Sequence, residues 1–125
     1  MNVPTKEAIR PVKQILLVDD DKSLLRMVQD VLTASGHTVV ALSDFQTAKN
    51  YLALNVPEAI ITDVRLGEFN GLQLVILAKQ ANPAVRAVVM TGYDDIGISK
   101  EAERLGATYL VKPVHVLDLV KFIEA

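Results

Sequence analysis

The stretch QILLVDDD, residues 14–21, joins an uninterrupted apolar run to three consecutive aspartates. An apolar run of this length, without polar alternation, is typical of a strand that is buried on both faces, as in a parallel sheet covered by helices. The aspartates that follow lie at the carboxyl end of this strand. The stretch therefore predicts the type of sheet and the edge at which its polar groups gather.

Four further apolar runs, rich in Val and Ile, alternate with segments in which apolar residues recur at helical spacing. Strands that alternate with helices form right-handed crossover units, and such units assemble into an open, doubly wound sheet. The sequence therefore predicts an α/β fold with a single five-stranded parallel sheet of strand order 2-1-3-4-5, the flavodoxin-like arrangement of five βα units. The predicted strands are Gln14–Asp19, His37–Leu42, Glu58–Asp63, Val85–Thr91 and Ala107–Lys112.

Helices are expected between these strands and after the last one. Asp21 suits the N-cap of the first helix, and Gly36 suits a left-handed stop just beyond its end. The second helix opens at Asp44, and the other three are predicted over residues 71–82, 96–105 and 116–124. The fourth is only weakly apolar, whereas the fifth is apolar on more than one side.

The chain has the composition of one soluble globular domain. It contains 125 residues, of which 50% are hydrophobic and 22% charged, enough for one buried core. The formal charge is −2 and the basic residues are scattered, so we expect no direct binding to nucleic acid or to a membrane. The absence of cysteine excludes disulfides, thiolate metal sites and thiol nucleophiles.

Residues 1–13 are predicted to be an N-terminal extension, and residues 14–125 the domain itself. The extension is polar, contains Pro4 and Pro11 and has no apolar run, so it has the features of neither a signal peptide nor a membrane anchor. We therefore expect a cytoplasmic protein.

Polar residues end or follow four of the five predicted strands. Asp19 and Asp20 lie at the first strand, and Asp63, Thr91 and Lys112 end the third, fourth and fifth. These four strands are neighbours in the predicted order, so their polar residues converge at the carboxyl edge, where such sheets bind ligands. Taken singly, each residue could be a helix cap or a solvated strand end. Their convergence favours a functional site.

Three carboxylates in one place repel one another, and their pKa values rise unless a cation neutralises them. Oxygen ligands without histidine or cysteine favour Mg²⁺, which commonly bridges a carboxylate to a phosphate. A lysine ammonium and a threonine hydroxyl can contact the equatorial oxygens of a phosphoryl group, and one carboxylate can act as the nucleophile. The pattern therefore predicts phosphoryl chemistry that depends on Mg²⁺.

Four segments, ILLVDDD, IITDVRLGEFNG, VVMTGY and GATYLVKP, resemble in order and spacing the signature segments of response-regulator receiver domains. The resemblance covers residues 14–125. It implies a domain of two-component or phosphorelay signalling in which Asp63 takes a phosphoryl group from a histidine kinase or a histidine phosphotransfer protein. Such a domain is not an enzyme in its own right, because it only accepts the group by self-catalysis and loses it slowly.

The resemblance also implies a role for each residue around the acceptor. Asp19 and Asp20 would hold Mg²⁺ together with Asp63 and the backbone carbonyl of Arg65. Lys112 would pair with the phosphoryl oxygens, and the peptide bond that follows it, to a proline, is expected to be cis.

Thr91 is similar to the family's switch hydroxyl, which moves toward the phosphoryl group, and Tyr109 to the aromatic residue that turns inward with it. The output face would then be formed by the fourth helix, the fifth strand and the fifth helix, and would act on a downstream effector protein or domain. Leu117 and Phe122 are expected to point away from the sheet on this face. They could form a partner surface or a homodimer contact, or they could be scattered exposed apolar residues.

Two positions near the acceptor depart from the usual pattern of the family. Gly67 stands where proline is usual and puts the stiffness of this loop in question, and Asn70 stands where aspartate is usual before Gly71. Arg65 and Tyr93 occupy the two variable positions that, in this family, flank the path of the hydrolytic water. Their bulk predicts slow hydrolysis of the phosphoaspartate.

Two other functions compete with this interpretation. A phosphatase of the haloacid-dehalogenase class would use Asp19 and Asp21 as its Asp-x-Asp motif, with Thr91 and Lys112 as further motif residues. That class needs another acidic motif on a later strand, whereas only a helix follows Lys112 in this sequence. A degenerate receiver would be a docking scaffold without phosphorylation. Turnover of a phosphate ester would favour the phosphatase, and a lack of labelling by acetyl phosphate would favour the scaffold.

Overall fold

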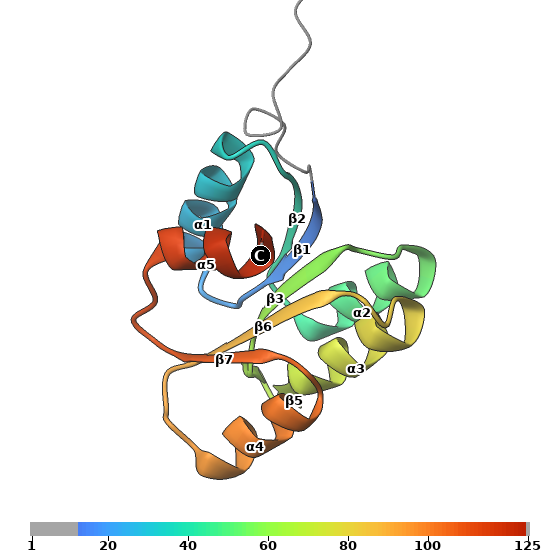
Figure 1. Cartoon of the computed structure of the whole chain (residues 1–125), viewed down its shortest axis with the longest axis vertical. Coiled ribbons are helices and arrows are strands. Elements are labelled where there is room, and N and C mark those ends of the chain that lie inside the picture. The colour runs from blue at the N-terminus through green and yellow to red at the C-terminus, as the bar shows by residue number, and fades with distance from the viewer. Residues whose placement is uncertain (1–12, 125) are drawn as a thin grey trace, which may run out of the picture.

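The computed structural model describes residues 13–124 of the chain (Figure 1). The predicted N-terminal extension, apart from Lys13, and the predicted end of the domain at Ala125 lie outside the described residues. None of the helices within this part of the chain combines the length and the hydrophobicity that crossing a membrane requires.

Five parallel strands form the central sheet in the order β2-β1-β3-β6-β7 (Figure 1). Because β6 and β7 are the fourth and fifth of the predicted strands, this order confirms the prediction 2-1-3-4-5. Four of the polar residues placed at strand ends fall just outside the strands: Asp19, His37, Glu58 and Lys112. The strands are β1 Gln14–Val18, β2 Thr38–Leu42, β3 Ala59–Asp63, β6 Arg86–Thr91 and β7 Thr108–Val111.

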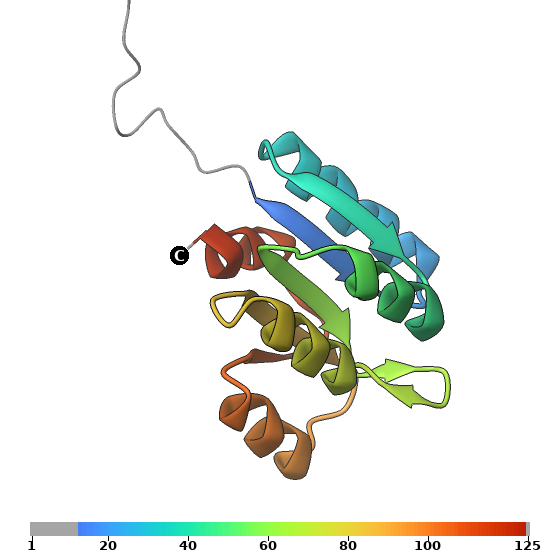
Figure 2. The ribbon, with the colours of Figure 1, turned by 90° about the vertical axis from the view of Figure 1, so that its right-hand side faces the viewer.

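Helices cover both faces of this sheet, with α1 and α5 on one side and α2, α3 and α4 on the other (Figures 1 and 2). The side chains of β1 alternate between two buried clusters: Ile15 and Leu17 pack with α1 and α5, and Leu16 and Val18 pack with α2 and α3. Burial on both sides explains why this strand shows no polar alternation. The helices are α1 Lys22–Ala34, α2 Phe45–Leu54, α3 Leu72–Ala81, α4 Ile96–Arg104 and α5 Val116–Glu124.

A short hairpin between β3 and α3 was not predicted. Its strands, β4 Arg65–Leu66 and β5 Phe69–Asn70, pair in antiparallel fashion across a two-residue turn. Gly67 has φ +63° at the first position of that turn, as the type II′ turn requires. Strands of two residues are too short to show a period, so the sequence could not indicate them. Glycine at the usual proline position therefore serves a tight turn.

The tip of the hairpin is attached to α2. The Phe69 ring stacks on the Phe45 ring with 4.6 Å between the ring centroids and 9° between the planes. Phe45 is the first residue of α2 and is buried, whereas Phe69 is 44% exposed. The stack therefore fixes the segment that follows Asp63 against the body of the domain.

His37 links both ends of the domain at the edge opposite the carboxyl ends of the strands. Its buried ring accepts a hydrogen bond from the Lys13 backbone N–H at Nδ1 (3.1 Å), and its Nε2 lies 2.8 Å from the Glu124 carboxylate. Because Nδ1 is an acceptor, Nε2 carries the hydrogen and donates it to Glu124. The structure thus supports a structural role for this histidine.

Gly71 brings the start of α3 against the end of β3. A Cβ atom at this position would lie 1.9 Å from the backbone oxygen of Asp63 and 2.9 Å from the hydroxyl oxygen of Thr62. The Gly71 N–H donates a hydrogen bond of 2.6 Å to the carbonyl of Val64. Only glycine permits this approach, because any side chain would displace the backbone of Asp63.

We therefore expect Gly71→Ala to lower the free energy of unfolding by about 1–3 kcal/mol, the usual cost of overpacking. Chemical denaturation in urea measures this change. Gly92→Ala is the matched control, because a Cβ atom there meets no heavy atom within 4 Å. Equal stability of the two variants would contradict the argument from the close approach.

Candidate functional site

The carboxyl edge of the sheet brings the predicted polar residues together. Asp19 follows β1, Asp63 ends β3, Thr91 ends β6 and Lys112 follows β7. Asp19, Asp63 and Thr91 are buried, with exposed fractions of 1%, 8% and 4%. The strand order places these residues at one edge of the sheet although they are far apart in the sequence.

Lys112 connects the two buried carboxylates. Its ammonium nitrogen lies 2.9 Å from Oδ2 of Asp19 and 3.1 Å from Oδ2 of Asp63. The Lys112 backbone N–H also donates a hydrogen bond of 2.7 Å to the carbonyl of Thr91. The residue is therefore fixed to β6 at its backbone while its side chain reaches over to β3 and β1.

Asp19 is held in place from its other side. Its Oδ1 accepts a hydrogen bond of 2.9 Å from the backbone N–H of Asp21. Burial raises the pKa of Asp19 above its ordinary value, although the bonds from Asp21 and Lys112 act in the opposite direction. Burial alone would lower the pKa of Lys112, but its hydrogen bonds to Asp19 and Asp63 raise that pKa overall. The ammonium therefore stays charged throughout the neutral range.

Asp20 completes an acidic group. Carboxylate oxygens of Asp19, Asp20 and Asp63 lie within 4.8 Å of one another, and Asp20 is the exposed member of the three. Three carboxylates face the single ammonium of Lys112, which leaves an excess of two negative charges. An all-oxygen ligand set with this excess fits a hard divalent cation such as Mg²⁺.

Asp21, the third aspartate of the opening stretch, has a different task. Its carboxylate accepts hydrogen bonds from the backbone N–H groups of Ser23 and Leu24, at 3.1 and 3.2 Å, and so caps α1. This is the cap that the sequence predicted. A carboxylate committed to these two donors does not fit the Asp-x-Asp motif of a phosphatase.

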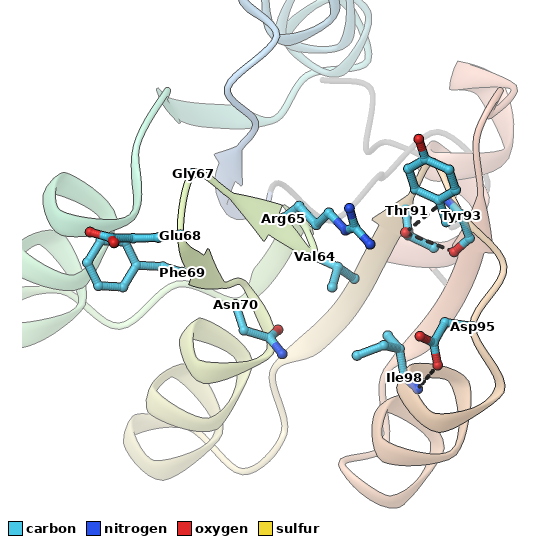
Figure 3. Close-up of a pocket in the computed structure, with 10 residues that line it drawn as sticks. All are labelled: Val64, Arg65, Gly67, Glu68, Phe69, Asn70, Thr91, Tyr93, Asp95 and Ile98. Carbon is cyan, nitrogen blue, oxygen red and sulfur yellow. Dashed lines mark hydrogen bonds between the residues drawn. The ribbon is translucent and has the colours of Figure 1, made fainter.

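Thr91 directs its hydroxyl toward the loop that joins β6 to α4. This hydroxyl donates to the backbone carbonyl of Tyr93 (3.0 Å) and accepts from the Tyr93 N–H (3.2 Å), as Figure 3 shows. Tyr109 lies near the far end of the same loop. Its hydroxyl accepts from the Asp95 N–H (2.9 Å) and lies 3.1 Å from the Asp94 carboxylate.

A pocket of about 370 Å³ lies between the β4–β5 hairpin and the β6–α4 loop (Figure 3). At its rim, the Arg65 guanidinium lies over the Tyr93 ring, 4.9 Å from the ring centroid. The Arg65 backbone N–H also donates to Oδ1 of Asp63 (3.3 Å). The sequence placed Arg65 and Tyr93 beside the acceptor, but it gave no sign of this cation–π contact, which depends on the fold.

Asn70 is a further residue whose task the sequence did not indicate. Its Oδ1 accepts a hydrogen bond of 2.8 Å from the backbone N–H of Leu72, the first residue of α3. Because Gly71 offers no side chain to cap that helix, Asn70 supplies the acceptor instead. An amide does this as well as the usual aspartate, which explains why the departure is tolerated.

The family model for the response regulator receiver domain matches residues 15–124. Among curated proteins, the response regulator protein FleR of Pseudomonas aeruginosa is 36% identical over 111 residues, which cover 86% of this chain and 24% of FleR. The chain spans between 22% and 62% of the length of the curated relatives compared with it.

Two solved structures are similar over most of the chain. A response regulator receiver domain protein (CheY-like) from Methanospirillum hungatei JF-1 has a TM-score of 0.83 and 26% identity, with 90% of this chain and 91% of that chain covered. A response regulator protein from Burkholderia pseudomallei, solved with a phosphorylated aspartic acid, a calcium ion and citrate, has a TM-score of 0.81 and 27% identity over 90% and 67% of the two chains. These neighbours confirm the predicted flavodoxin-like fold.

The raised pKa of Asp19 leads to a prediction about metal binding. A carboxylate must be ionised to bind Mg²⁺, so a proton on Asp19 competes with the metal. We expect the affinity for Mg²⁺ to fall as the pH decreases through the raised pKa of Asp19, and therefore above the ordinary carboxylate pKa of about 3.9. Calorimetric titration with Mg²⁺ at several pH values measures this dependence.

Asp30→Asn is the matched control for this titration, because it makes the same change in charge at an exposed position of α1. It should keep the affinity and the pH dependence of the wild type, whereas Asp19→Asn should lose affinity. An affinity that stays constant until the pH nears the ordinary carboxylate value would contradict the prediction.

Proposed function

Because the chain belongs to the family of response regulator receiver domains, we propose that it is a phosphorylation switch in which Asp63 accepts the phosphoryl group. The observation that carries the proposal is the contact of the Lys112 ammonium with both Asp19 and Asp63. It leaves the acceptor carboxylate buried beside a fixed positive charge. The phosphorylated aspartic acid in the Burkholderia pseudomallei neighbour supports the same assignment.

In the proposed transfer, an oxygen of the Asp63 carboxylate attacks the phosphorus atom of a phosphohistidine. A P–O bond forms as the P–N bond breaks, and the electron pair of that bond leaves with the imidazole of the donor. The Lys112 ammonium neutralises charge on the phosphoryl oxygens, and the backbone N–H of Arg65 orients the carboxylate through its bond to Oδ1. The donor would be a histidine kinase or a histidine phosphotransfer protein.

Asp19, Asp20, Asp63 and the backbone carbonyl of Arg65 would hold Mg²⁺. When bound, the ion supplies charge neutralisation between the carboxylates and the incoming phosphoryl group. The group of carboxylate oxygens within 4.8 Å supports this choice of ligands. The single ammonium of Lys112 cannot balance three carboxylates, which gives the cation a reason to bind.

After transfer, Thr91 would exchange its partner. Its hydroxyl would leave the Tyr93 backbone and bond to a phosphoryl oxygen, and Tyr109 would turn inward from Asp94 and Asp95. Residues 14–125 would form the receiver domain that makes this change, and residues 1–13 an extension of it. The phosphoryl group would be the signal, so the domain would act as a switch rather than as an enzyme with turnover.

The proposed output face consists of α4, β7 and α5, and it carries exposed apolar side chains. Ile96 and Leu117 are 75% and 65% exposed, and Val111 and Phe122 are 40% and 36% exposed. The partner would be a downstream effector protein or domain in the cytoplasm, with a homodimer as the alternative. Several curated relatives named as transcriptional regulatory proteins are longer than this chain, which supports an effector.

The first prediction of this proposal concerns covalent labelling. After incubation with acetyl phosphate and Mg²⁺, intact mass spectrometry should find one phosphoryl adduct. The adduct should be absent from Asp63→Asn and after chelation of the metal, and present in the Asp30→Asn control. No adduct on the wild type would point to a docking scaffold, and an adduct that survives Asp63→Asn would contradict the assignment of the acceptor.

The second prediction concerns the lifetime of the adduct. Arg65, whose backbone N–H bonds to Asp63, and Tyr93 on the β6–α4 loop line the same pocket, and their bulk should restrict the approach of water to the phosphoaspartate. We expect slow hydrolysis, followed as the decay of the adduct mass after the donor is removed. A half-life of seconds at room temperature would contradict this expectation.

A further inference from the structure

The loop between β6 and α4 is held at three points. At its start, the Thr91 hydroxyl bonds to the backbone of Tyr93. At its end, Tyr109 accepts a hydrogen bond from the backbone N–H of Asp95, the residue that caps α4. Between them, Arg65 points from β4 toward Tyr93 (Figure 3), and its guanidinium carbon lies 4.9 Å from the centroid of the Tyr93 ring. The first two contacts come from Thr91 at the end of β6 and from Tyr109 in β7. The third comes from Arg65 in β4, the segment that follows Asp63.

The Thr91 hydroxyl can donate only one hydrogen bond. Its hydrogen is committed to the carbonyl of Tyr93 at 3.0 Å, and its oxygen accepts from the N–H of the same residue at 3.2 Å. A bond from this hydroxyl to a phosphoryl group on Asp63 requires the hydroxyl to turn away from the Tyr93 carbonyl and release that bond. Whatever fixes the backbone of Tyr93 therefore opposes that movement.

Few other contacts fix the ring of Tyr93. Its side chain is 67% exposed, and within the described part of the chain its phenolic hydroxyl has no hydrogen-bond partner. The guanidinium of Arg65 lies 4.9 Å from the ring centroid, within the distance of an attractive cation–π interaction. This contact ties the Tyr93 side chain to β4, which begins two residues after Asp63.

We propose that Arg65 is a positioning residue, which holds the Thr91 hydroxyl away from Asp63 by fixing the Tyr93 ring and so opposes the active conformation. This inference rests on the proposed function, because it concerns the equilibrium of the same switch. It assigns to the Arg65 side chain a task distinct from that of its backbone, which bonds to Asp63.

The contact is also sensitive to the charge of the acceptor. Phosphorylation replaces the single negative charge of the Asp63 carboxylate by the roughly two charges of an acyl phosphate, and the guanidinium can leave the neutral ring for the phosphoryl oxygens. Release of the ring would free the backbone of Tyr93 and hence the hydroxyl of Thr91. Phosphorylation would thus weaken the restraint that it has to overcome.

The test is a double-mutant cycle on the full chain, with beryllium trifluoride and Mg²⁺ as the phosphoryl mimic. The apparent affinity is measured by ¹⁹F NMR for the wild type, Tyr93→Leu, Arg65→Gln and the double variant. Arg65→Gln also removes an attraction for the anion, but that loss is the same in both backgrounds and cancels in the cycle. Tyr93→Phe is the matched control, because it keeps the ring and removes a hydroxyl that has no described partner.

Tyr93→Leu should raise the apparent affinity about two- to fivefold in the wild-type background, the range that a solvent-exposed cation–π contact permits. It should have no effect in the Arg65→Gln background, and Tyr93→Phe should bind like the wild type. In parallel, the ¹H–¹³C signal of the Thr91 methyl group without the mimic should shift toward its bound position in Tyr93→Leu.

An equal effect of Tyr93→Leu in both backgrounds, or no effect in either, would overturn the inference while leaving the proposed function intact. Failure of the wild type itself to bind the mimic would instead overturn the proposed function. The two failures are therefore distinguishable within one experiment.

Discussion

Two buried carboxylates beside one ammonium are the constraint on which the rest of the structure depends. Asp19 and Asp63 are 1% and 8% exposed, and the Lys112 nitrogen lies 2.9 and 3.1 Å from their oxygens. Without an opposite charge, the burial of two ionised carboxylates would be strongly unfavourable. Even with Lys112 present, burial raises the pKa of Asp19. The fold therefore holds these carboxylates together at a cost in electrostatic free energy, which a bound cation would lower.

The strand order makes this arrangement possible. Lys112 follows β7 at the edge of the sheet, whereas Asp63 ends β3 and Asp19 follows β1, both on the far side of β6. Thr91 pairs with Val111, and the Lys112 N–H bonds to the Thr91 carbonyl. These contacts fix the position along β6 at which the lysine side chain crosses that strand. A shift of β7 by one residue would turn this side chain to the other face of the sheet. The contacts of Lys112 with the two carboxylates therefore depend on the register of β7.

The sheet order and the polar residues at its carboxyl edge could be predicted because both depend on patterns that are visible in the sequence alone. Short apolar runs rich in Val and Ile mark buried strands, and parallel strands with right-handed crossovers bring their carboxyl ends to one edge. The hairpin of Arg65–Leu66 and Phe69–Asn70 gave no such signal because its strands have two residues each. The orientations of the Thr91 and Tyr109 hydroxyls could not be predicted either, since neighbours on other segments decide them.

In the proposed switch, the direction of the Thr91 hydroxyl would keep the two conformations close in free energy. A hydrogen bond to a charged phosphoryl oxygen is roughly twice as strong as one to a neutral carbonyl. The exchange of the Tyr93 carbonyl for that oxygen is therefore favourable in itself. However, the proposed change would also break the contacts of the loop with Arg65 and Tyr109, and their loss would offset part of this gain. A small remaining difference between two conformations is what a ligand-driven switch requires, because a large one would leave a single state populated in all conditions.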